Sequence, residues 1–238
     1  SVVKSLWHVK MKAVQLAPTG RAAKVISNYT EKEAHTIHRK IYYPKSEGGG
    51  KISFTLQKNK HRNTLFIVDE ASMISDNTTE SKLFENGSLL DDLMHYVYSG
   101  HNCKLLLIGD NAQLPPVKLD ISPALDASKL RMDYNKEVTT IELDEVMRQA
   151  ETSGILSNAT RIREFMNDEM YDDFRFDLNG QDDLIRLIDG HEILEALDDS
   201  YREHGNEGTA IIVRSNKRAN LYNQQIRSRI MFREEELS

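Results

Sequence analysis

The sequence predicts an α/β fold with a parallel sheet whose two faces are covered by helices. Apolar runs of strand length alternate with segments of helical character over about the first 150 residues, as in sheets built from strand–helix–strand units. Polar groups follow three predicted strands, in "APTG", "DEAS" and "GDNAQ". Because ligands of open α/β sheets bind beyond the carboxyl ends of the strands, we expect these segments to form one site.

The elements of the first half follow a regular order. "KAVQLAP" (12–18) is a predicted strand that ends at a proline, and "TGRAAKVISNYT" is the helix after it. "PKSEGGGK" (44–51) is a predicted glycine-rich turn. The other predicted elements are a short helix at 33–42, a half-exposed strand at 51–57, a buried strand in "TLFIVDE", a helix at 89–99, a buried strand at 103–110 and a strand within 138–146.

From about residue 151 the pattern restarts, which predicts a second α/β domain. The division we expect is therefore 1–150 and 151–238, and the second domain looks incomplete because no final strand is evident. An acidic, turn-rich connection is predicted at 168–183. The predicted elements are helices at 153–166, 192–205 and 216–230, with strands at 184–189 and 208–215.

Composition indicates which broad classes of protein the chain can belong to. The 238 residues carry a net charge of −6, with 39% hydrophobic and 29% charged residues, typical of a soluble globular protein. No apolar run approaches the ~20 residues of a membrane span, and the start lacks a signal-peptide core. Cys103, the one cysteine, excludes an internal disulfide and is interpreted as a buried, inert thiol. We expect a cytoplasmic protein without membrane partners.

Asp69 and Glu70 end the apolar run "LFIV". Buried charge is costly unless it is paired or holds a metal, so a carboxylate pair at a strand end suggests chemistry there. In nucleoside triphosphatases an Asp in this position holds Mg²⁺, and a neighbouring Glu orients and polarises the attacking water. The alternative is an exposed acidic strand end.

The run "LLLIGDNAQLPPV" (105–117) delivers Gly109, Asp110 and Gln113 to the same edge. A neutral amide such as that of Gln113 can hydrogen-bond a terminal phosphate or the attacking water without adding charge. Pro115 and Pro116 prevent the following backbone from continuing as helix. The alternative is a strand, a turn and a polyproline exit without function.

Five segments follow one another along the chain: "LAPTGRAAK", "HTIHR", "IVDEAS", "GDNAQLPPV" and "ELDEVMRQ". This is the order seen in superfamily 1 DNA helicases, and the segments resemble the RecD-like branch with 5′→3′ polarity. The stretch "AIIVRSNKRANLYNQQIR" (210–227) is also similar to the start of that family's second motor domain.

The resemblance implies a RecA-like P-loop NTPase domain followed by the start of a second one, with ATP bound between them. It implies Mg²⁺ on Asp69, water activation by Glu70 and γ-phosphate sensing by Gln113, with Asp110 also at the nucleotide. Arg148 would act as an arginine finger supplied in cis, which stabilises charge in phosphoryl transfer. A surface helix arginine is the alternative for Arg148.

The resemblance also implies contacts to single-stranded DNA. Hydroxyl and backbone N–H groups of Thr19, Gly20 and Thr36 can bind phosphates, which fix position rather than read sequence. His38 can stack or hydrogen-bond, or it can be a packed or solvated helix residue. The DNA-contacting residues predicted from the two segments are Pro18, Thr19, Gly20, Arg21, Thr36 and His38.

The family inserts a small β-hairpin that splits the duplex where residues 41–63 lie. "GGGKISFTLQKNKHR" combines flexible glycines, an exposed-strand aromatic and several cations. Phe54 would press against the last base pair, and a solvated surface hairpin is the alternative. "KNKHR" (58–62) is a basic patch.

The sequence departs from the family at both ends. The Gly-x-x-x-x-Gly-Lys-Ser/Thr loop that cradles the β- and γ-phosphates is absent from residues 1–15, and the late family motifs are missing. We therefore interpret the chain as the middle of a helicase and expect ATP binding and hydrolysis by these residues alone to be very weak or absent.

The interpretation we adopt is an ATP-driven DNA helicase or translocase motor, with Mg-ATP as cofactor and single-stranded DNA or a single-strand/duplex junction as partner. The resemblance adds roles in DNA repair and recombination, and nuclease or repair-complex subunits as candidate partners. The rival is a non-hydrolysing helicase-like scaffold, favoured by the missing phosphate loop and the acidic balance. The set Asp69, Glu70, Gln113 and Arg148 disfavours it.

Overall fold

The computed structural model describes residues 2–47, 51–77, 88–143, 153–168, 170 and 175–231. The chain divides into two compact units, Ser1–Glu145 and Val146–Ser238. The elements of the first unit are α1 (Val2–Ser5), β1 (Lys12–Ala17), α2 (Gly20–Thr30), β2 (Ala34–Thr36), α3 (Ile37–Ile41), β3 (Tyr42–Glu47), β4 (Lys51–Leu56), β5 (Arg62–Val68), α4 (Leu89–Tyr98), β6 (His101–Leu107) and α5 (Ala127–Tyr134). Those of the second are α6 (Gly154–Asn167), α7 (Gly190–Gly208) and α8 (Asn216–Arg229).

The four-stranded sheet of the first unit has the order β2-β1-β5-β6, and every neighbouring pair is parallel. In register, Leu16 lies beside Val68, which lies beside Leu107. The strands at 12–18, "TLFIVDE" and 103–110 are thus confirmed and adjacent. The sheet agrees with the predicted α/β class.

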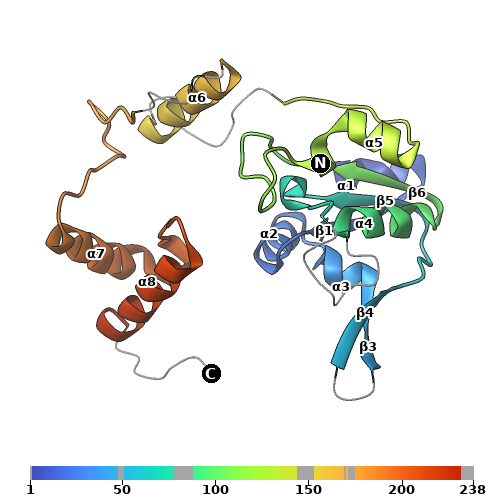
Figure 1. Ribbon diagram of the computed structural model, residues 1–238, viewed down its shortest axis with the longest axis horizontal. Helices are drawn as coiled ribbons and strands as arrows, with labels where there is room; N and C mark the ends of the chain where they lie inside the picture. The colour runs from blue at the N-terminus through green and yellow to red at the C-terminus, as the bar shows by residue number, and fades with distance from the viewer. Residues whose placement is uncertain are drawn as a thin grey trace. The chain divides into compact units, whose positions relative to one another are not determined.

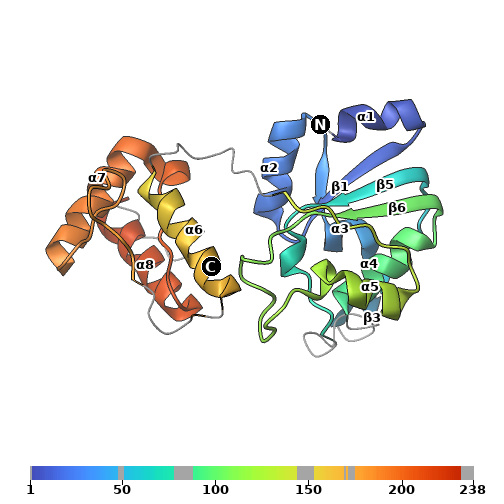
Figure 2. The same cartoon turned by 90° about the horizontal axis from the view of Figure 1, so that it is seen from above.

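Helices cover both faces of this sheet, as Figure 2 shows with α1 and α2 on one side and α3 and α4 on the other. Alternation along the strands sends Leu16, Phe66 and Val68 into the core beneath α3 and α4. On the opposite face the Gln15 Nε2 donates to the Thr30 Oγ1 of α2 at 3.0 Å. Burial on both faces explains the near-continuous apolar strands.

The insertion is a β-hairpin, as predicted, in which β3 and β4 pair antiparallel from Tyr42 opposite Leu56 outward. Figure 1 shows it projecting from the body of the first unit. Its base is closed by the Gln57 N–H, which donates to the Ile41 carbonyl at 2.7 Å, and by the Gln57 Nε2, which donates to the Tyr42 carbonyl at 2.6 Å.

Two predictions in the first unit need correction. The helix expected at 33–42 is a short edge strand, β2, followed by α3, because residues 34–36 pair with β1. The strand expected within 138–146 is not formed over its described part, 138–143, where Ile141 and Leu143 are 84% and 88% exposed. Side chains so exposed gain little from strand formation.

The regular elements of the second unit are helices over its described residues. The strands predicted at 184–189 and 208–215 are not formed there, because Gly208 ends α7 and the other residues have no regular secondary structure. Ile185 and Ile212 are 83% and 97% exposed, so no neighbouring strand or helix buries them. A strand is stabilised by its ladder and by burial, and these segments have neither.

No helix among the described residues is both long enough and apolar enough to cross a membrane.

Candidate functional site

The carboxyl ends of β1, β2, β5 and β6 meet at one edge of the sheet, which we call the carboxyl edge. Ala17 lies beside Thr36, and Val68 lies beside Leu107. "PTGR" follows β1, "DEAS" follows β5 and "GDNAQ" follows β6. The three polar segments are therefore brought together, as the sequence predicts.

The "DEAS" turn is fixed to both neighbouring strands through its backbone. The Asp69 N–H donates to the Leu16 carbonyl at 3.0 Å, and the Ala71 N–H donates to the Ile108 carbonyl at 2.8 Å. Between these bonds Glu70 has φ 55° and ψ 36°, a left-handed conformation that is uncommon for a residue with a side chain. Such strain persists only where the surroundings enforce it, and it is concentrated at functional sites.

The two carboxylates are half-buried. Asp69 Oδ1 accepts the Glu70 N–H at 2.9 Å, which orients the Asp69 carboxylate on its own turn. Ser72, two residues further, has a buried hydroxyl without a hydrogen-bond partner in the described parts of the chain. The turn thus combines an oriented carboxylate, a strained Glu and an unused hydroxyl.

The "GDNAQ" turn packs closely against the "DEAS" turn. A Cβ atom on Gly109 would lie 2.9 Å from the Ser72 backbone nitrogen, so only glycine fits there without displacement. Asp110 Oδ1 accepts the Ala112 N–H at 2.9 Å, and the Gln113 N–H donates to the Asp110 carbonyl at 3.1 Å. Gln113 is exposed at this edge, where it can reach a ligand.

Thr19 and Thr36 cap the helices that start at the carboxyl edge. Thr19 Oγ1 accepts the Ala22 N–H of α2, and Thr36 Oγ1 accepts the Arg39 N–H of α3, both at 3.2 Å. Each hydroxyl keeps its own hydrogen for a phosphate oxygen. Gly20 and Arg21 are exposed on the first turn of α2, and Pro18 is half-buried before it.

The two remaining predicted DNA contacts differ in burial. His38 is exposed on α3, its ring lies 5.8 Å from the Tyr42 ring, and desolvation lowers its pKa below the usual range. Phe54 is half-buried and packs against the core cluster, rather than being an exposed-strand aromatic. Their roles at DNA stay predictions.

The residues of the edge fit Mg²⁺ bound together with a nucleotide. No group of three or more His, Cys, Asp or Glu side chains suited to a metal ion occurs within the described residues. Mg²⁺ keeps several waters and is held by one or two carboxylates plus phosphates, so Asp69 alone suffices on the protein side. Arg148 lies outside the described residues.

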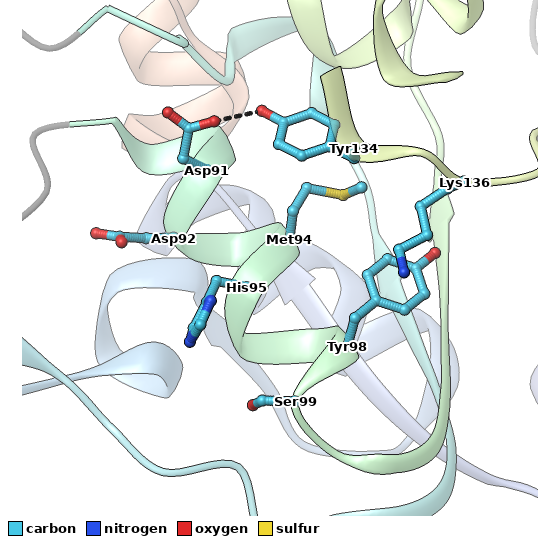
Figure 3. Close-up of a pocket in the computed structure, with 8 residues that line it drawn as sticks. All are labelled: Asp91, Asp92, Met94, His95, Tyr98, Ser99, Tyr134 and Lys136. Carbon is cyan, nitrogen blue, oxygen red and sulfur yellow. Dashed lines mark hydrogen bonds between the residues drawn. The ribbon is translucent and has the colours of Figure 1, made fainter. Parts of the chain in front are cut away.

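A pocket of about 500 Å³ lies along α4, and none of the predicted site residues lines it (Figure 3). The Tyr134 hydroxyl donates to Asp91 Oδ1 at 2.6 Å, and Lys136 Nζ lies 4.5 Å from the centre of the Tyr98 ring. Burial and Asp91 raise the pKa of Tyr134, so the phenol remains a donor. These contacts attach the end of α5 and the residues after it to α4, and indicate a structural role.

Sequence reasoning missed a second polar site, a recess of about 330 Å³ that joins α3 to the loop before β5. "KNKHR" was recognisable as a basic patch, but its partners Arg39 and Lys40 come from "HTIHR" and its following residue. Only the fold brings these two segments together.

Comparisons with known proteins agree with this geometry. A family model described as an AAA domain matches residues 1–119, half of the chain. The "ATP-dependent RecD2 DNA helicase" of Deinococcus radiodurans is 32% identical over 147 residues, which are 60% of this chain and 16% of that protein. The chain thus spans a small part of the length of this relative.

Proposed function

We propose that the first unit of this chain carries ATP-hydrolysing and DNA-tracking residues of a DNA helicase. The premise is that the chain belongs to the AAA domain family and is a RecD-like superfamily 1 helicase-type chain with a RecA-like α/β fold. The observation that carries the proposal is the convergence of "PTGR", "DEAS" and "GDNAQ" on one sheet edge. Family membership alone supports nucleotide chemistry, and the geometry supplies residues for it.

In this proposal the "DEAS" turn divides two roles between adjacent residues. Asp69, oriented by the Glu70 N–H, would hold Mg²⁺ with its carboxylate. Mg²⁺, when bound, neutralises charge on the β- and γ-phosphates. Glu70, turned by its left-handed backbone, orients the attacking water and accepts its proton.

Gln113 and Arg148 complete the proposed hydrolytic set. Gln113 is exposed at the carboxyl edge and carries a neutral amide that can hydrogen-bond a terminal phosphate. Arg148 would supply positive charge to the transferring phosphoryl group, an effect of about 10³-fold or more. Asp110 fixes the turn that presents Gln113 through its bond to the Ala112 N–H.

The same edge provides a path for one DNA strand. The hydroxyls of Thr19 and Thr36 and the first turn of α2 face this edge with donors for phosphate oxygens. Phosphate contacts do not depend on base identity, which suits a protein that moves along DNA. Closure and reopening of the nucleotide site would then move the strand.

The rival function is a non-hydrolysing scaffold, and one observation favours it. Residues 1–238 contain no Gly-x-x-x-x-Gly-Lys-Ser/Thr loop, so hydrolysis requires a phosphate-binding loop from outside these residues. The proposal therefore concerns the full-length product of the gene that encodes residues 1–238.

A conservative substitution tests the role of Glu70. Glu70→Gln removes the base and keeps the size, so ATP turnover by the full-length product should fall about 10²–10⁴-fold, while DNA binding is retained. Glu137→Gln, on an exposed residue away from the edge, is the matched control. Unchanged turnover in Glu70→Gln would contradict the assignment, and no turnover in any variant would favour the scaffold.

A further inference from the structure

Six basic or imidazole side chains line the recess noted above, which we call the basic recess. They come from β2, from α3 and from the loop between β4 and β5, and Tyr96 of α4 lies at its base. They are His35, Arg39, Lys40, Lys58, Lys60 and His61. Arg39, Lys58 and Lys60 are exposed, so their charged groups reach solvent.

The loop that carries the lysines is held rigidly by a buried side chain. Asn59 is 7% exposed, and its Nδ2 donates to the Tyr96 and Val97 carbonyls at 2.8 and 3.2 Å. Its Oδ1 accepts the His61 N–H at 2.9 Å. Asn59 therefore satisfies carbonyls at the end of α4 and fixes Lys58 and Lys60 on either side of it.

The positive charge of the recess is largely uncompensated. Within the described residues, Arg39, Lys40, Lys58 and Lys60 form no ion pair; the acidic contact at this site is Glu33, 3.5 Å from the His35 Nδ1. Burial lowers the pKa of His61, and the nearby positive charges of Lys40 and Lys12 lower it further. The whole chain has a net charge of −6, so the positive charge of the basic recess is a local exception.

We propose that the basic recess binds the phosphate backbone of duplex DNA at the foot of the β3–β4 hairpin. This deepens the proposed helicase function and rests on it for the identity of the nucleic acid. Lys58 and Lys60 precede β5, and the predicted metal-binding Asp69 follows it, so these lysines lie roughly 20 Å from Asp69, at the opposite end of a seven-residue strand. His35 and Arg39 complete the recess from beside Thr36 of the carboxyl edge.

The lining favours duplex over single-stranded DNA. Proteins that bind single strands combine cations with aromatic rings on which bases stack. Tyr96, the tyrosine of the recess, is 3% exposed and cannot offer a face to a base, and the imidazole rings of His35 and His61 are only partly exposed. Exposed cations beside covered or partly covered rings suit paired DNA, whose bases are hidden and whose phosphates are outside.

Paired substitutions in the 238-residue chain test this proposal by fluorescence anisotropy with a short blunt duplex and with oligothymidylate. Lys58→Gln/Lys60→Gln should weaken duplex binding about 10-fold or more and reduce the slope of log K against log salt by about 2. Oligothymidylate binding should stay within about twofold. Lys58→Arg/Lys60→Arg should retain duplex affinity, which separates lost charge from lost folding.

Lys10→Gln/Lys104→Gln is the matched control. Lys10 and Lys104 are exposed, and Lys104 alternates with Cys103 and Leu105, which face the core under α4, so it points away from the recess. Equal duplex affinity in the recess and control variants would overturn the proposal, as would a wild-type chain that binds no duplex. Recess-dependent binding of oligoglutamate without duplex binding would assign the site to an acidic protein segment instead.

The outcomes also separate this inference from the proposed function. Loss of the recess effect with intact single-strand binding and ATP turnover contradicts the inference alone. Recess-dependent duplex binding in a protein whose full-length product neither hydrolyses ATP nor binds single strands contradicts the helicase and keeps the duplex site.

Discussion

The carboxyl edge and the basic recess are held in place by different kinds of contact. At the edge, backbone N–H groups of Asp69 and Ala71 bond to the carbonyls of Leu16 and Ile108, so main chain positions the carboxylates. At the recess, the buried side chain of Asn59 bonds to the end of α4. Side-chain changes at the edge should therefore alter chemistry, whereas loss of the recess anchor should alter shape and stability.

The largest expected change in stability comes from Asn59→Ala. The substitution leaves the Tyr96 and Val97 carbonyls and the His61 N–H without their partner in a buried place, which should lower the free energy of unfolding by about 3 kcal/mol. Urea denaturation of the chain measures it. Asn28→Ala, on an exposed face of α2, should change stability by less than about 0.5 kcal/mol.

Substitution of one glycine at each site should disturb that site alone, and should lower the free energy of unfolding somewhat less than Asn59→Ala does. A Cβ on Gly100 would lie 2.5 Å from Asn59 Nδ2, and one on Gly109 would lie 2.9 Å from the Ser72 nitrogen. Each Gly→Ala change should cost about 1–3 kcal/mol through overpacking. Gly190→Ala, with nothing within 4 Å, is the control.

The functional consequences of the two glycine variants should differ. Gly100→Ala should weaken duplex binding and leave single-strand binding intact, whereas Gly109→Ala should lower ATP turnover by the full-length product. Denaturation midpoints and anisotropy measure the first, and a phosphate-release assay measures the second. If both variants lose the same function, the two sites are not independent.

The smallest expected effect is the contribution of His61, in the basic recess, to the pH dependence of the free energy of unfolding. Burial and the charges of Lys40 and Lys12 lower the folded-state pKa of His61 below the value of about 6.5 in an unfolded chain. Below that value the unfolded chain binds more protons, so the free energy of unfolding should fall as pH falls through 6.5. In His61→Gln this fall should be smaller, and an unchanged profile would contradict the assignment.

The carboxyl edge was predictable because its parts are strand ends. Apolar runs locate β1, β5 and β6, and a parallel sheet aligns their carboxyl ends whatever the connections do. The left-handed backbone of Glu70 and the close packing of Gly109 against Ser72 could not be predicted from the sequence pattern. The basic recess was not predictable, because α3 and the "KNKHR" loop are separated in sequence by the β3–β4 hairpin, and the loop is held by hydrogen bonds to the α3 and α4 carbonyls that no local pattern reports.

The incorrect strand predictions have a related cause. At 184–189 and 208–215 the local pattern is apolar and β-branched, but strand formation depends on neighbours that no local pattern reports. In the first unit β1, β5 and β6 supply neighbours for each other. The local sequence pattern therefore predicted strands correctly only where several predicted strands pair with one another in one sheet.

The central claim is that the carboxyl edge couples ATP hydrolysis to single-stranded DNA. The most direct measurement is steady-state ATP hydrolysis by the full-length product of the gene that encodes residues 1–238, with Mg²⁺, in the presence and absence of oligothymidylate. The account predicts turnover that rises severalfold with the oligonucleotide. Absence of turnover, or turnover that oligothymidylate leaves unchanged, would contradict it.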